Sequence, residues 1–142
     1  MSEEEWDDAA GDAFIARFER GEVPAEEFPH REHVRLAWLY LRRLPLAEAC
    51  ARFVAGIKRF AAAQGKPERY HETITWAYLL LINERDARAA RAQTWDEFAD
   101  ANADLLDWEN SVLKSYYRAE TLSSDVARKV FLLPDKIGER AG

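Results

Sequence analysis

The histidines are the residues of this chain whose type and spacing best suit metal binding or catalysis. His30 and His33 stand three positions apart, and His71 is followed directly by Glu72. Two histidines at that spacing project from the same side of a helix, and a third from a neighbouring helix can complete a set of nitrogen ligands. The pattern therefore predicts a polar site to which two separate segments of the chain contribute.

A divalent metal ion is the first ligand that such a set would hold. The positive end of the helix dipole favours neutral imidazole at a helix start, and neutral imidazole is the form that binds metals. Glu72, or Glu32 if it turns inward, would add a carboxylate, and zinc, iron and manganese are the ions that this donor set predicts. Glu72 would act as a catalytic base if one coordination position stayed open to substrate. We therefore expect the metal ligands to be His30, His33, His71 and Glu72.

Two other interpretations stay open at this stage. Helix starts also attract anions, and Arg31 and Arg69 are close enough in sequence to help bind a small carboxylate or phosphate without catalysis. In the third interpretation the histidines make only ordinary internal hydrogen bonds. The protein would then be a structural scaffold or a homodimer without pocket chemistry.

Apolar spacing indicates which elements carry the histidines. Along 30–41 the two histidines share one helical face with apolar side chains, whereas the arginines fall on other faces. A second amphipathic helix is predicted over 46–61, between Pro45, which begins it, and Gly65, which closes it. Short connections of this kind favour antiparallel neighbours.

A third helix of this group is expected to start near Glu68. From 74 to 82 it is apolar nearly all round, which predicts that it is the central and most buried helix. If the three helices alternate in direction, the first and the third begin at the same end of the bundle. All three histidines would then lie at that end, with His71 in the first turn of its helix.

Other segments complete an all-helical chain. A helix around 14–18 ends at Gly21, Thr94 and Glu97 form the pattern of a capping box, and shorter helices are predicted near 112–117 and 126–131. No segment alternates polar and apolar residues as a strand would. The sequence therefore predicts one all-α domain over 1–142, a bundle of about six or seven helices, with a frayed acidic N-terminus at 1–8.

Composition excludes several classes of function. The formal net charge of -6 and the scattered basic residues argue against nucleic acid as a partner. No apolar run approaches the roughly 18 residues of a membrane span, and the acidic start lacks the features of a signal peptide. Cys50 is the single cysteine, which excludes disulfide scaffolds and cysteine-based zinc sites and favours a reducing compartment, the cytoplasm. A small-molecule ligand or a second copy of the chain remains as partner.

Three segments carry a resemblance to other proteins. They are 28–38 (FPHREHVRLAW), 70–76 (YHETITW) and 122–135 (LSSDVARKVFLLPD), and they are spread over most of the length of the chain. In these segments the sequence resembles a family of small all-helical bacterial proteins with His-x-x-His and Tyr-His-Glu-Thr strings. The resemblance implies a helical fold and a grouping of these strings, and it brings no activity, cofactor or site residue with it.

Overall fold

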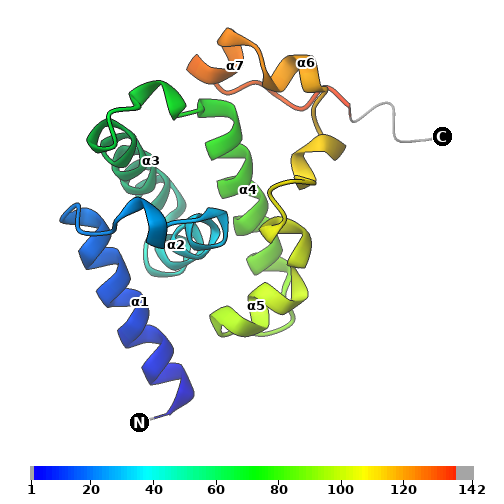
Figure 1. Ribbon diagram of the computed structural model, residues 1–142. Helices are drawn as coiled ribbons and strands as arrows, with labels where there is room; N and C mark the ends of the chain where they lie inside the picture. Colours follow the sequence, from blue (N-terminus) through cyan, green and yellow to red (C-terminus); the bar gives the residue numbers. More distant parts are fainter. Residues whose placement is uncertain (1, 137–142) are drawn as a thin grey trace.

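The computed structural model describes residues 2–136, and within them every regular element is helical. The predicted all-α bundle is confirmed (Figure 1). The α-helices are α1 (Glu3–Glu19), α2 (His30–Arg43), α3 (Leu46–Ala63), α4 (Glu72–Arg88), α5 (Trp95–Ala101), α6 (Ala119–Leu122) and α7 (Asp125–Lys129). Short 3-10 helices lie at Ala25–Glu27, Pro67–Arg69, Ala103–Leu106 and Val112–Ser115.

Local capping explains most of the helix boundaries. Gly21 and Gly65 adopt a φ of +71° directly after α1 and α3, a conformation that side chains with a Cβ rarely take. The predicted capping box is present, because Thr94 and Glu97 each accept a backbone N–H of the other. Ser2 caps α1 by accepting a hydrogen bond from the N–H of residue 5, so the helix begins inside the segment that the sequence predicts to be frayed.

The start of α4 differs from the prediction. Residues Pro67–Arg69 form a separate 3-10 turn, and α4 begins only at Glu72. His71 precedes the helix in an extended conformation, with φ -130° and ψ 110°, and its Nδ1 accepts a hydrogen bond of 3.1 Å from the N–H of Ile74. His71 is therefore the N-cap of α4 rather than a residue of its first turn, a position that polar side chains with an acceptor stabilise.

The centre of the bundle is α2 and not α4. All residues from 36 to 40 on α2 are buried, whereas Leu80 on α4 is 40% exposed. In Figure 1, α2 lies among α1, α3 and α4, and the chain after α5 covers the other side of α4. The prediction that α4 is the most buried helix was wrong, because one side of α4 faces solvent despite its apolar sequence.

Polar side chains at the start of α4 hold the C-terminal segment. His71 Nε2 donates to the carbonyl of Leu122 at 2.7 Å. The fully buried Thr73 hydroxyl donates to the carbonyl of Val130 at 2.8 Å and accepts from the N–H of Leu132 at 3.1 Å. The segment that contains α6 and α7 is therefore attached to α4 through hydrogen bonds made in a place that excludes water.

Replacing Thr73 tests this attachment. Thr73→Val keeps the shape of the side chain but removes the partner of the Val130 carbonyl and of the Leu132 N–H, so the free energy of unfolding should fall by on the order of 1–3 kcal/mol. Urea unfolding measures it. Thr73→Ser, which keeps the hydroxyl, is the matched control and should retain most of the stability. A valine variant as stable as the parent would contradict the role of these bonds.

Candidate functional site

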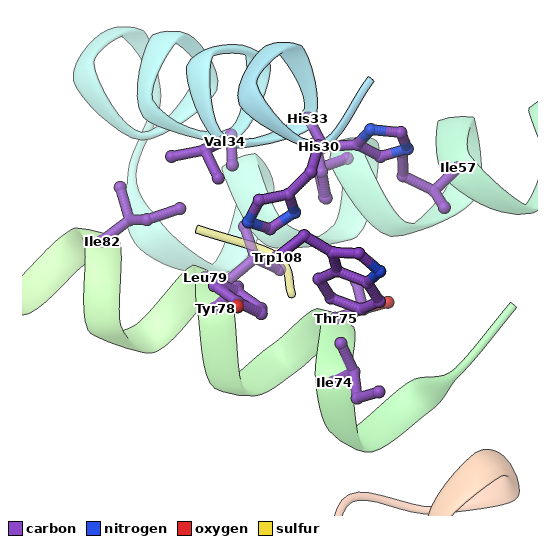
Figure 2. Close-up of a pocket in the computed structure, with 12 residues that line it drawn as sticks. His30, His33, Val34, Ile57, Ile74, Thr75, Tyr78, Leu79, Ile82 and Trp108 are labelled. Carbon is purple, nitrogen blue, oxygen red and sulfur yellow. The ribbon is translucent and has the colours of Figure 1, made fainter. Parts of the chain in front are cut away.

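A cavity of about 290 Å³ lies between α2, α3, α4 and the loop at 107–111 (Figure 2). We call it the inner cavity. Most of its wall is aliphatic, and the lining side chains that carry polar atoms are His30, His33, Thr75, Tyr78 and Trp108. A mostly apolar wall with a few polar groups is typical of small-molecule sites.

His33 is held in one orientation by its surroundings. Its Nδ1 lies 3.1 Å from the carbonyl oxygen of Pro29, and because a carbonyl only accepts, Nδ1 carries the proton. The ring stacks on Phe28 with centroids 3.9 Å apart and meets the edge of Phe60. Burial lowers the pKa of His33 to about 4, although the bond to Pro29 acts in the opposite direction. His33 is therefore neutral near pH 7, with an unprotonated Nε2.

His30 is fixed in a similar way. Its Nε2 donates to the carbonyl of Leu105 at 2.8 Å, which leaves Nδ1 as the unprotonated nitrogen. The ring packs against both Tyr78 and Trp108, whose centroids are each 5.0 Å away. Burial lowers the pKa of His30, and this effect outweighs the bond to Leu105 and the charge of Asp107, which both raise it. A second neutral imidazole thus lines the inner cavity.

The inner cavity is consequently rich in hydrogen-bond acceptors. Each imidazole donates its N–H to a backbone carbonyl. Among the residues described, no other hydrogen bond involves the remaining nitrogens, Nδ1 of His30 and Nε2 of His33. Thr75 donates its hydroxyl proton to the carbonyl of His71 at 2.7 Å, so toward the cavity it can only accept. A bound molecule that offers N–H or O–H groups, or a metal ion, would complement this arrangement.

His71 lies outside the inner cavity. As Figure 2 shows, α2 and α4 run side by side in the same direction, so they begin at the same end, as the sequence predicts. His30, however, packs against Tyr78, which is seven residues after His71 and hence about 10 Å further along the helix axis. His71 also uses both ring nitrogens, one as the cap of α4 and one on Leu122.

The other residues named as candidates lie in separate places. Glu72 does not line the inner cavity, and its Oε1 accepts a hydrogen bond of 2.5 Å from Tyr70. Arg31 is exposed and lies over the ring of Trp95. Arg69 lines a second cavity of about 360 Å³, which we call the outer cavity. Among the side chains that the structure describes, no group of three or more His, Cys, Asp or Glu is placed to hold a metal ion. Of the four predicted metal ligands, the structure thus brings together only His30 and His33.

Trp108 is the lining residue that the sequence analysis missed. It is 52% exposed and yet lines the inner cavity, because the loop after the 3-10 helix at Ala103–Leu106 carries it across the ring of His30. The available signal was a tryptophan within an acidic, polar loop, where no helical face accounts for it. A large apolar side chain left partly in water is often part of a binding surface.

Comparisons with protein-family models, with curated proteins and with solved structures found no match. The resemblance to small bacterial helical proteins therefore stays a prediction. None of the described helices is both long and apolar enough to cross a membrane. The function of this chain is accordingly inferred from the geometry of its own cavity.

The lowered pKa of His33 predicts a dependence of stability on pH. The unfolded chain takes up a proton at His33 near its ordinary pKa of 6.5, whereas the folded chain does so only near 4. The contribution is complete above pH 6.5 and is lost as the pH falls toward 4, by on the order of 3 kcal/mol. Urea unfolding of the parent and of His33→Gln between pH 7 and pH 4 should show a flatter profile for the variant. Parallel profiles would contradict the buried, neutral state.

Proposed function

We propose that the protein binds a small, largely apolar molecule in the inner cavity and holds it through hydrogen-bond donors of that molecule. The observation that carries this proposal is the pair of neutral imidazoles. His30 and His33 each give their N–H to a backbone carbonyl and keep one unprotonated nitrogen beside an apolar wall. The donors would bind to Nδ1 of His30 and Nε2 of His33.

The size of the inner cavity supports a bound molecule. Packed helices usually leave only voids about as large as a water molecule, and 290 Å³ is near the lower end of the range for small-molecule pockets. Filling the space with apolar groups would recover contacts that Phe53, Ile57 and Leu79 lack on their cavity side. An apolar body of the ligand therefore has a physical reason to enter.

The two acceptors are held in place before any ligand binds. The bond to Pro29 and the stacking on Phe28 fix the ring of His33, and Leu105 fixes that of His30. Groups that are already ordered lose little conformational entropy when a ligand arrives, so each hydrogen bond contributes more to affinity. A molecule without a donor would cover these nitrogens and leave them without a partner, which disfavours it.

Trp108 would serve as the aromatic cover of the site. Its ring lies at the edge of the inner cavity, tilted by 39° over both His30 and Tyr78. Being half exposed, it has surface left to bury against a ligand. Aromatic rings give a large apolar contact area and prefer offset or edge contacts with other rings, which favours an aromatic or cyclic ligand.

A divalent metal ion is the second candidate. The two unprotonated nitrogens of His30 and His33 are donors of the kind that zinc and iron bind. Because the described side chains do not add a third one of a ligating type, the remaining ligands would be water or atoms of a bound molecule. Glu72 and His71 would then have no part in the coordination, since both are engaged elsewhere.

A pair of matched small molecules tests the hydrogen-bond proposal. 4-Ethylphenol offers a hydroxyl donor, and its methyl ether has nearly the same shape without the donor. Calorimetric titration should show binding of the phenol at least tenfold tighter than binding of the ether, which corresponds to about 1.4 kcal/mol. His33→Phe should remove most of this preference, whereas Arg88→Met, at the opposite end of α4, should keep it.

Equal affinities for phenol and ether, or no saturable binding of either, would contradict the proposal. Thermal unfolding of each variant checks that it folds, because His33→Phe removes the ring N–H that binds the carbonyl of Pro29, although that carbonyl keeps the backbone N–H groups of Glu32 and His33 as donors. A preference for the phenol that survives His33→Phe would place the donor contact elsewhere and would also count against it.

Elemental analysis of untagged protein tests the metal candidate. If an ion occupies the site, His30→Ala and His33→Ala should each lower its stoichiometry strongly, whereas a folded His71→Asn variant should keep it. Asparagine retains an acceptor for capping α4, so this variant separates a ligand role from a structural one. Protein that contains no metal and is not stabilised by added zinc, iron or manganese would rule this candidate out.

A further inference from the structure

The outer cavity lies directly beside the inner one. His33 and Ile57 line both cavities, so they form the wall between them. The floor of the outer cavity is apolar and includes Phe28 and Phe60. Its rim differs, because Lys66 and Arg69 stand there. A molecule that extends past Ile57 from the inner cavity would therefore pass from an apolar environment to a cationic one.

The two cations of this rim have no carboxylate partner among the described residues. Eight arginines form ion pairs with carboxylates. For the side chains of Lys66 and Arg69, in contrast, the described part of the chain provides neither an ion pair nor a hydrogen bond. Lys58 adds a third positive charge, since its Nζ lies 5.0 Å from the ring of Tyr70, another lining residue. The net charge of -6 makes such a local excess of positive charge notable.

None of the described side chains that line the outer cavity is a carboxylate. Glu72 is held by the hydroxyl of Tyr70 at 2.5 Å, and Glu68 is not among the side chains that line the outer cavity. An anion in the outer cavity would therefore find its partners at Lys66 and Arg69. A guanidinium binds a carboxylate with two parallel hydrogen bonds, which favours a carboxylate as the anionic group.

We propose that the ligand is an amphiphilic carboxylate of the hydroxyaryl class, with its hydroxyl among the imidazoles of the inner cavity and its carboxylate at the rim of the outer cavity. The proposal rests on the function proposed above and adds the charge and the length of the ligand. The linker between the two groups has to cross the wall at His33 and Ile57. A short molecule can satisfy only one end, so affinity should pass through a maximum as the linker grows.

A series of ω-(4-hydroxyphenyl)alkanoates with increasing linker length tests this inference by calorimetric titration. Each acid is compared with its methyl ester, which lacks the charge, and with its phenol methyl ether, which lacks the donor. We expect one linker length to bind tightest, and its ester to bind at least tenfold more weakly. Higher ionic strength should weaken binding of the acid and leave that of the ester unchanged.

Charge-removing variants locate the anion. Arg69→Met should reduce affinity for the acid by about the factor that separates acid from ester, and Lys66→Met should also reduce it. Both side chains are exposed and unpaired among the described residues, so these variants should fold as the parent does, which circular dichroism checks. Arg88→Met removes the same charge at the far end of α4 and should leave affinity for the acid unchanged.

The two proposals fail in different ways in this experiment. Esters that bind as tightly as acids, with Arg69→Met and Lys66→Met without effect, would overturn the inference about the carboxylate and leave the donor preference intact. Ethers that bind as tightly as phenols, with the preference for acids retained, would overturn the function proposed for the inner cavity. An affinity that does not depend on linker length would overturn the assignment of the two ends to two cavities.

Discussion

The imidazole of His71 makes two hydrogen bonds on which the arrangement of the other elements depends. Its Nδ1 accepts the N–H of Ile74 and so sets the residue at which α4 begins. Its Nε2 donates to Leu122, 51 residues later, and so positions the C-terminal segment. Because a carbonyl requires a donor and a backbone N–H requires an acceptor, only the neutral tautomer with a proton on Nε2 satisfies both. One side chain thereby couples a helix start to a distant turn.

The inner cavity lies along the N-terminal part of α4. With Glu72 as its first residue, α4 turns Ile74, Tyr78 and Ile82 toward α2, since residues four apart share a helical face. The parallel course of α2 then sets His30 beside Tyr78, two turns after the cap. A start of α4 at Glu68 would still allow this face, but it would replace the extended backbone that lets His71 cap the helix. The separate 3-10 turn after Pro67 therefore leaves His71 in the conformation that caps α4.

The sequence predicted the helices, the shared start of α2 and α4, and the place of His30 and His33 in a first turn, because these depend on local periodicity and on Pro29, Pro45 and Gly65. It did not predict the role of His71, since the cap depends on backbone conformation and the second bond on a residue far along the chain. His71 and His30 are offset by about two helical turns along the axis of α4. This offset depends on how far α2 is shifted along α4, which the spacing of apolar residues within each helix does not predict. Trp108 was missed because its position over His30 depends on the conformation of a loop, which the sequence pattern does not predict.

Burial explains both the protonation state and the selectivity of the two cavity histidines. Removing water from the rings of His30 and His33 disfavours the charged form, so each presents a lone pair and not a second N–H. The same lack of water strengthens a hydrogen bond that a ligand donates to that lone pair. An anion would be repelled by two acceptors at this depth, which is why positive charge is useful only further out, at Lys66 and Arg69. The inner cavity can thus select for shape and donors, while the outer rim can select for charge.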